Sequence, residues 1–156
     1  MELVKWLSIA DRYTKMYLDR HFLPLGINSS QHMYLLKVCE QPGITQDQML
    51  ECFYVHPSNV TRSIVALAKA GFLRREANPE DKRTCRLYPT ERAEAVCQPI
   101  RDICTQWQQK LLRAFSTQER QMFLTMLHQT GMQAVEEWGK SERETGTPET
   151  EEAQHV

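Results

Sequence analysis

The stretch PSNVTRSIVALAKAGFLRREANPEDKRTCRLY, residues 57–88, contains a helical pattern followed directly by two alternating segments. Pro57 stands at the expected first helical position, where its missing N–H has no intrahelical partner to lose. Gly71 is the expected end of this helix, because glycine readily adopts the left-handed conformation that follows a helix C-terminus. The alternating segments 72–77 and 83–88 flank an Asn-Pro-Glu-Asp turn, which is typical of a β-hairpin. The stretch therefore predicts a short helix joined to a hairpin.

Further amphipathic helices are predicted on both sides of this stretch. Thr45-Gln46-Asp47-Gln48 and Ser116-Thr117-Gln118-Glu119 both have the form of a capping box, so a helix is expected to begin at each. The first predicted helix covers residues 2–22, and the second runs from Asn28 or Ser29 to about residue 41. Two shorter helices are predicted over 45–53 and 57–70. Two long helices are predicted to begin at Thr90 and within 116–119. This order predicts a mainly α fold.

The helix predicted over 57–70 has two different faces. At 100° per residue Val60, Ile64 and Leu67 fall on one side together with Gly71, and we expect this side to pack against the helix at 45–53. The opposite sector carries Ser58, Thr61, Arg62, Val65 and Lys69, with Asn59 beside it. Short polar groups and cations at the start of a helix are typical of a recognition helix that reads DNA. An ordinary solvated helix face gives the same pattern, so the helix alone does not decide between the two interpretations.

The charge distribution favours the recognition helix. Between Pro57 and Arg92 eight Lys and Arg side chains stand against four Asp and Glu, although the whole chain has a formal net charge of −1. Residues 141–156 carry five Glu and one Arg. Positive charge is thus concentrated on the helix and hairpin, where a DNA backbone would meet it. A helix-turn-helix followed at once by a basic hairpin predicts a winged helix, with about six helices in all and a two- or three-stranded β wing.

Over about residues 3–139 the chain resembles the MarR-type winged-helix transcriptional regulators. The matching segments are PGITQ at 42–46, PSNVTR at 57–62, Leu67, GFL at 71–73, Arg75 and NPEDKR at 78–83. The resemblance implies an obligate homodimer that is built by the first, fifth and sixth helices and carries two DNA-binding lobes. It implies DNA contacts from Ser58, Asn59, Thr61 and Arg62 and from Arg83 in the wing, and release from DNA by a small molecule or an oxidant.

Three features depart from the family pattern. His56 stands where the family usually has a small N-cap residue, so the recognition helix is expected to start differently. Leu87-Tyr88-Pro89-Thr90 replaces the usual Leu-Thr start of the long helix. The first helix contains no cysteine, whereas the peroxide-sensing branch of the family keeps its reactive thiol there.

We expect one winged-helix domain over residues 1–140, followed by an acidic, disordered tail over 141–156. Within this domain, segments 1–25 and 90–140 are predicted to dimerise through apolar stripes that the central lobe, 28–89, is too small to cover. The predicted dimer interface therefore consists of the terminal helices.

The predicted function is sequence-specific binding of double-stranded DNA, with repression through a pseudo-palindromic operator. The predicted DNA contacts are Thr45, Gln46, Ser58, Asn59, Thr61, Arg62, Val65, Lys69, Lys82, Arg83 and Arg86. Asp81 is expected to orient Arg83 through a charge-assisted hydrogen bond. A small aromatic or anionic effector is expected near Tyr13, Tyr17 and His32, at the junction between the terminal helices and the lobe.

Composition and motifs argue against several other functions. No apolar run approaches the ~18–20 residues that span a bilayer, and Asp11 and Arg12 interrupt any secretory signal pattern, so we expect a cytoplasmic protein without a membrane partner. The chain has neither GxGxxG nor GxxxxGK, and no Ser/His/Asp order or paired carboxylates emerge, so we expect no catalytic residues, no cofactor and no enzyme. The histidines show no i, i+4 pairing, and we expect no metal site. A winged helix that binds a protein instead of DNA remains an alternative.

The five cysteines leave a redox-responsive regulator as a further alternative. Their odd number and spacing do not indicate a disulfide framework. Cys39, Cys97 and Cys104 lie on apolar stripes, where a free cysteine behaves as a small hydrophobic residue. Cys85 is the best candidate for a redox sensor, because Arg83 and Arg86 flank it on the wing.

Overall fold

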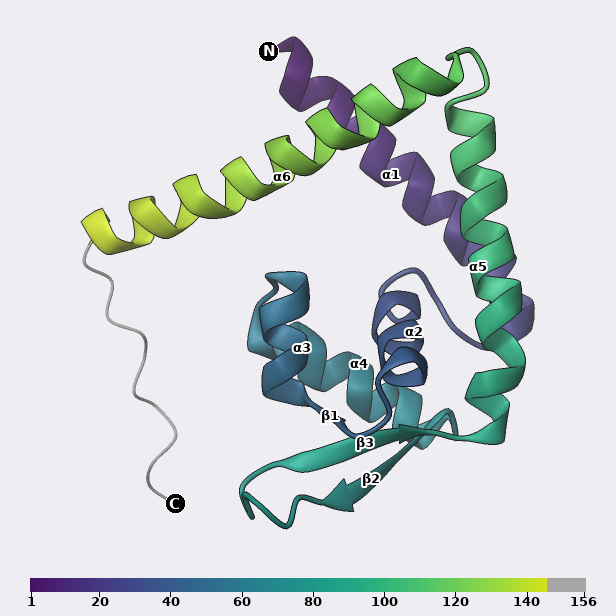
Figure 1. Cartoon of the computed structure of the whole chain (residues 1–156), viewed down its shortest axis with the longest axis vertical. Coiled ribbons are helices and arrows are strands. Elements are labelled where there is room, and N and C mark those ends of the chain that lie inside the picture. Colours follow the sequence, from purple (N-terminus) through teal and green to yellow (C-terminus); the bar gives the residue numbers. More distant parts are fainter. Residues whose placement is uncertain (146–156) are drawn as a thin grey trace. The chain divides into compact units, whose positions relative to one another are not determined.

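The computed structural model describes residues 1–145 and divides into two units (Figure 1). A three-stranded antiparallel sheet, five α-helices and one short 3-10 helix form the first unit. This unit spans Met1–Leu111, and the second unit begins at Leu112. The first unit contains, in chain order, α1 (Glu2–Phe22), the short 3-10 helix η1 (Leu23–Leu25), α2 (His32–Glu40), β1 (Ile44–Thr45), α3 (Gln46–Phe53), α4 (Pro57–Lys69), β2 (Leu73–Ala77), β3 (Cys85–Pro89) and α5 (Glu91–Leu111). The second contains α6 (Thr117–Thr145). The predicted winged helix-turn-helix architecture is confirmed in this part of the chain.

The predicted helix starts and stops follow from local hydrogen bonds. Thr45 and Gln48 form both halves of the capping box at the start of α3. Ser116 and Glu119 do the same before α6, where the Ser116 N–H donates to Glu119 Oε2 at 2.7 Å. After α4, Gly71 adopts φ +80° and the Phe72 N–H donates to the Leu67 carbonyl at 2.9 Å. This Schellman ending turns the chain directly from α4 into β2.

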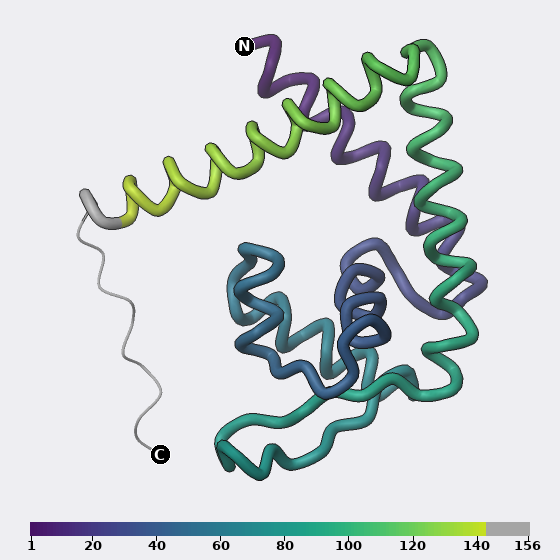
Figure 2. The backbone as a smooth tube through the Cα atoms, in the orientation of Figure 1, coloured from purple at the N-terminus to yellow at the C-terminus, as the bar shows by residue number. Residues whose placement is uncertain are grey.

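The sheet has the strand order β1-β3-β2, so β3 is its central strand. Leu87 of β3 lies opposite Ile44 of β1 and Arg75 of β2, and its neighbour Arg86 lies opposite Thr45 and Glu76. Leu87 is fully buried, whereas Arg75 is exposed. In Figure 2 the tube passes from α4 into the hairpin of β2 and β3 and then directly into α5.

The core of the first unit lies between the sheet, the end of α1 and the inner faces of α2 to α5. It joins large side chains that are fully buried and come from every one of these elements: Phe22, Leu35, Met49, Ile64, Phe72, Leu87 and Ile100. Burial of each such side chain stabilises the fold by about 1.5–3 kcal/mol relative to leaving it exposed. The same core fixes α4 against α3, α2 and β2, so the outward face of α4 is held by a rigid scaffold.

Two expectations from the sequence, on the start of the second helix and on Gly71, are corrected. The second helix begins at His32 rather than at Asn28 or Ser29, because Asn28 forms a turn of its own: its Oδ1 accepts from the Ser30 N–H at 3.0 Å and its carbonyl from the Gln31 N–H at 3.1 Å. Such side-chain turns compete with helix. Gly71, which we placed on the apolar face of α4, is exposed beyond the end of that helix.

The start of the acidic tail is also displaced. Helix α6 continues to Thr145, although the tail was expected from Ser141. Lys140 forms ion pairs with Glu136 at 2.7 Å and with Glu137 at 3.0 Å, both about one turn earlier, and such pairs stabilise a helix. Glu and Arg also have favourable helix propensities, so the helix continues into the segment that was expected to be the tail. Residues 146–156 of the predicted tail lie outside the described residues. No helix among residues 1–145 is long and apolar enough to cross a membrane.

Candidate nucleic-acid interface

Helix α4 starts at an unusual N-cap residue. His56 has an extended backbone (φ −65°, ψ 138°), and its Nδ1 accepts a hydrogen bond from the Ser58 N–H at 3.2 Å. The same nitrogen lies 2.7 Å from Ser58 Oγ. The imidazole thus replaces the hydroxyl or carboxylate that usually satisfies an unpaired N–H at a helix start. Since only an unprotonated nitrogen accepts a hydrogen bond, this cap requires the tautomer with a free Nδ1.

The outward face of α4 is polar and accessible. Val60, Ile64 and Leu67 are buried, as expected from the helical pattern. The residues predicted to contact DNA from this helix are all exposed: Ser58, Asn59, Thr61, Arg62, Val65 and Lys69. The helical period therefore separates one face that packs on the core from one face that is available to a partner.

Hydrogen bonds between side chains restrain this outward face. Arg62 donates from Nη2 to Asn59 Oδ1 at 3.2 Å, one turn earlier on the same helix. Gln46, the first residue of α3, donates from Nε2 to Thr61 Oγ1 at 3.1 Å. Gln46 thereby ties the beginning of α3 to the middle of α4, while the hydroxyl of Thr45 is used by the capping box. Side chains restrained in this way lose less conformational entropy when they bind a ligand.

In the wing, a carboxylate orients an exposed cationic side chain through hydrogen bonds. Arg83 donates from Nε to Asp81 Oδ1 at 3.2 Å and from Nη2 to Asp81 Oδ2 at 3.3 Å, and its backbone N–H donates to Oδ1 at 3.0 Å. These hydrogen bonds lower the pKa of Asp81 and raise that of Arg83. The Arg83 side chain is nevertheless 89% exposed, so its guanidinium is both oriented and accessible. Lys82, next to it, is also exposed.

Arg86 has a different environment from Arg83. Its Nε donates to Asn78 Oδ1 at 3.2 Å, and its Nη2 lies 3.1 Å from Glu80 Oε2. Asn78 is buried and also binds Thr84, donating from Nδ2 to Oγ1 at 2.9 Å. Arg86 therefore holds the two ends of the hairpin turn together, and its charge is partly neutralised by Glu80.

Comparisons with known proteins agree with this architecture. The model of the MarR family matches residues 27–85, which run from the loop before α2 to the first residue of β3. A solved structure, described as the crystal structure of MarR, is 30% identical to this chain, covers 87% of it and 99% of its own length, and superposes with a TM-score of 0.74.

This chain belongs to the MarR family of transcriptional regulators.

Two other proteins place this MarR-family chain in context. An uncharacterised HTH-type transcriptional regulator of Bacillus subtilis, YybA, is 26% identical over 117 residues, which are 75% of this chain and 78% of that protein. A mutant MarR from E. coli that was solved in complex with operator DNA has a TM-score of 0.75 and 21% identity. That alignment covers 83% of this chain and 94% of the E. coli chain, and at this level of identity it supports a shared fold.

The residues predicted to form an effector site have separate contacts in this MarR-family chain. The ring of Tyr17 on α1 stacks on His21 and on Trp107 of α5, with centroids 4.0 and 4.2 Å away. Tyr13, one turn earlier on α1, is 56% exposed. His32 at the start of α2 instead contacts the ring of Phe22, and its burial lowers the pKa of the imidazole. Within residues 1–145 no ring contact or hydrogen bond joins Tyr17 to His32.

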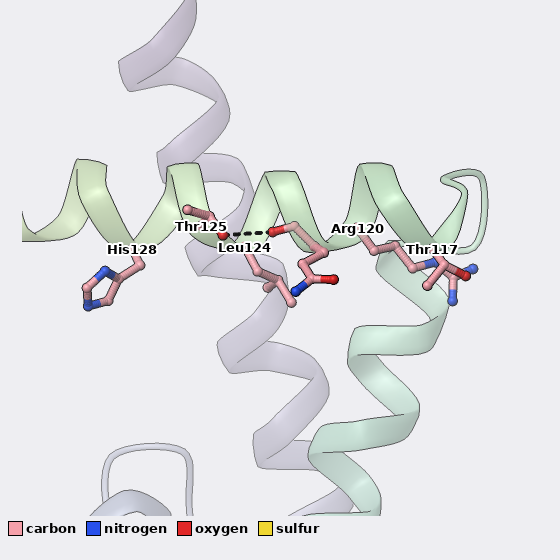
Figure 3. A pocket seen from close by; sticks show the side chains of 6 residues that line it. Thr117, Arg120, Leu124, Thr125 and His128 are labelled. Atoms are coloured by element: carbon pink, nitrogen blue, oxygen red, sulfur yellow. Dashed lines mark hydrogen bonds between the residues drawn. The ribbon is translucent and has the colours of Figure 1, made fainter.

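The second unit contains a hollow of about 720 Å³. Figure 3 shows that its lining residues all belong to α6, among them Arg120, Leu124 and His128. One helix does not enclose a ligand, so we assign no site to this hollow.

Sequence reasoning missed two polar residues that support the interface. Ser63 is buried on the apolar side of α4 and donates from Oγ to the Ser30 carbonyl at 3.4 Å, which links α4 to the turn before α2. Asn78 is the buried centre of the wing turn. The Asn-Pro pair indicates a turn, but no sequence pattern shows that its amide reaches Thr84 and Arg86.

Proposed function

We propose that this MarR-family regulator is a repressor that binds a pseudo-palindromic operator as a homodimer, with α4 in the major groove and the wing on the adjacent backbone or minor groove. The observation that carries the proposal is that one unit combines two accessible, oriented cationic groups. Arg62 lies on the outward face of α4, where it donates a hydrogen bond to Asn59. Arg83 lies in the wing, where the Asp81 carboxylate orients its guanidinium through hydrogen bonds. We expect the protein to work in the cytoplasm and to have no enzymatic activity.

In this proposal the recognition helix reads sequence. Ser58, Asn59, Thr61 and Arg62 lie in the first half of α4, which is the part of a recognition helix that reaches base edges. An Arg side chain that donates two hydrogen bonds to guanine discriminates against another base by about 1–3 kcal/mol. The side-chain oxygen of Asn59, Oδ1, accepts a hydrogen bond from Arg62 and so helps to orient the guanidinium.

The wing supplies affinity with little sequence preference. An exposed guanidinium such as Arg83 binds phosphate or enters a narrow minor groove. Lys69 on α4 and Lys82 in the wing are both exposed and add positive charge. Arg86 instead acts through the hairpin, because it bridges Asn78 and Glu80. Contacts of this kind release counterions, and binding should therefore weaken steeply with salt.

The homodimer is proposed from the apolar surfaces of the terminal helices. Trp6 on α1 is 56% exposed. Helix α6 also exposes a series of large apolar side chains: Met122, Phe123, Leu124, Met126, Leu127, Met132, Val135 and Trp138. Many large apolar side chains exposed along one helix favour an interface with a partner. Obligate dimer interfaces often bury more than ~2,000 Å² in total.

Release by a small aromatic or anionic effector near Tyr13, Tyr17 and His32 is a further part of this proposal. It is supported by the polar-tipped aromatic rings of α1, where Lys110 of α5 adds a positive charge 3.2 Å from the Tyr17 hydroxyl. We expect phenolic carboxylates to lower operator affinity and raise the melting temperature. If a panel of such ligands changes neither quantity, the effector part of the proposal is wrong.

The proposed function is tested by selecting binding sites from random duplex DNA, followed by titration of the selected and scrambled duplexes at several salt concentrations. We expect enrichment of an inverted repeat and a shift that weakens as salt increases. Sedimentation of the protein at micromolar concentration should show a dimer. A winged helix that binds protein would enrich no sequence, and a folded monomer in sedimentation would overturn the dimer.

A further inference from the structure

Two cysteines that are distant in sequence lie in contact where α2 packs against α5. The sulfur atoms of Cys39, near the end of α2, and Cys97, in the second turn of α5, are 2.7 Å apart. Cys97 is buried, and Cys39 is half-buried. A disulfide requires its sulfur atoms at about 2.05 Å. The two sulfur atoms therefore lie about 0.7 Å beyond bonding distance.

We propose that Cys39 and Cys97 are a redox modification site, at which oxidation by a hydroperoxide forms an intramolecular disulfide that clamps α2 to α5. The site lies outside the proposed DNA-binding surface, because Cys39 is on α2 and Cys97 is on α5. It also differs from the cysteine favoured by the sequence, since Cys85 is exposed on β3 and its cross-strand partner is Ala77.

The reaction consumes one hydroperoxide for each disulfide. Cys39, the more accessible thiol, attacks as a thiolate on the outer peroxide oxygen, forms a sulfenic acid and releases the alcohol, or water from hydrogen peroxide. The Cys97 sulfur then attacks the sulfenic sulfur, and the hydroxyl group leaves as water with the remaining thiol proton. The two sulfurs lose two electrons in total, and the peroxide O–O bond accepts them.

The surroundings of Cys39 make this reaction slow at neutral pH. Burial, together with the neighbouring Cys97, raises the pKa of the Cys39 thiol to about 12. Arg101 on α5 lowers this pKa and Glu94 raises it, so the two charges oppose each other. Since the thiolate is the attacking species, the rate should increase about tenfold per pH unit between pH 7 and 9. A thiol with an ordinary pKa near 8.5 would level off at the top of this range.

The disulfide would strengthen a junction that otherwise relies on packing and one ion pair. Glu40 directly follows Cys39, and Arg101 lies one turn after Cys97 on α5. These two side chains are joined by an ion pair at 3.2 Å, and both are about half exposed. A covalent bond between residues 39 and 97 closes a long loop in the unfolded chain and reduces its conformational entropy. We therefore expect the oxidised protein to melt about 5–15 °C above the reduced protein.

The experiment uses the full chain with the two exposed thiols removed, as Cys52→Ser/Cys85→Ser. After treatment with hydrogen peroxide, the free thiols are alkylated and the protein is digested, and a peptide pair joined through Cys39 and Cys97 should appear about 2 Da lighter than the sum of its two reduced peptides. In the same background, Cys39→Ser and Cys97→Ser should give no joined peptide, and the peptide with the remaining cysteine of the pair should instead gain oxygen in steps of about 16 Da. Cys104→Ser, which removes the other half-buried thiol of α5, is the matched control and should still form the bond.

Each variant is compared with its own reduced form by circular dichroism, so that a misfolded variant is recognised before oxidation. A joined peptide that persists in Cys39→Ser, a joined peptide that contains Cys104, or no joined peptide in the background protein would overturn the site. An oxidation rate that levels off above pH 8.5 would overturn Cys39 as the attacking thiol. An unchanged melting temperature after complete oxidation would overturn the clamp.

Discussion

Replacement of Arg83 by alanine should change the salt dependence of DNA binding more than its sequence preference. The guanidinium is 89% exposed and is held by Asp81 through two side-chain hydrogen bonds, an arrangement that suits a phosphate. Each phosphate contact in B-DNA contributes about −0.9 to the slope of log K against log salt concentration. Loss of one contact in each half of a dimer should therefore make the slope shallower by about 1.8.

This slope difference is large enough to measure. Between 50 and 200 mM salt the parent protein should lose about tenfold more affinity than Arg83→Ala. The assay is fluorescence anisotropy with operator and scrambled duplexes over that range. Arg12→Ala removes an exposed Arg from the polar side of α1 and is the matched control, which should leave the slope unchanged. Asp81→Ala keeps the cation but removes the carboxylate that orients it, so it should weaken binding to both duplexes less than Arg83→Ala does.

Two results would contradict a backbone contact by Arg83. If Arg83→Ala retained the parent affinity and slope on both duplexes, the wing would not contact DNA. If it weakened the operator but not the scrambled duplex, Arg83 would read sequence, and its assignment to the backbone would be wrong.

Three further predictions concern α4 and the core beside it. Arg62→Ala should flatten the preference at one base pair of each half-site by about 1–3 kcal/mol, measured with single-substitution operators, while Lys69→Ala should weaken all of them alike; an unchanged preference profile would exclude a base contact by Arg62. His56→Ala should lower the free energy of unfolding by about 0.5–2 kcal/mol in urea titrations, and His56→Ser should restore most of it, because serine also accepts the Ser58 N–H. Burial lowers the pKa of His32 below its ordinary 6.5, so the unfolded state binds more protons there. The free energy of unfolding should therefore fall as the pH drops below 6.5, and His32→Gln should make that fall smaller; an identical pH profile for the two proteins would contradict it.

Local chemistry made much of the fold predictable from the sequence. The two capping boxes, Pro57 at the start of α4 and Gly71 after its end all lie where expected. Each depends on hydrogen bonds or backbone angles among residues only a few positions apart, so neighbouring residue types are sufficient to indicate them. The same locality explains the one misplaced start, because a different local turn, centred on Asn28, outcompeted the first turn of α2.

The candidate site was predictable only as a set of exposed side chains. The helical period separated Arg62 from Ile64 correctly, since the period alone determines which residues share a face. It could not show that Gln46 reaches Thr61, or that Arg86 is occupied by Asn78 and Glu80. Those contacts join different elements, or the two sides of a hairpin, and depend on how the elements pack.

The helices, the hairpin and the polar face of α4 can be predicted from the sequence, because they follow from patterns with periods of two to four residues. Which distant residues meet depends instead on tertiary packing. Cys39 and Cys97 look in the sequence like two ordinary members of apolar stripes, and the packing of α2 against α5 brings their sulfur atoms together across 58 positions of the chain. That contact depends on the angle and register between two helices, which are set by the whole core and not by the residues beside either cysteine.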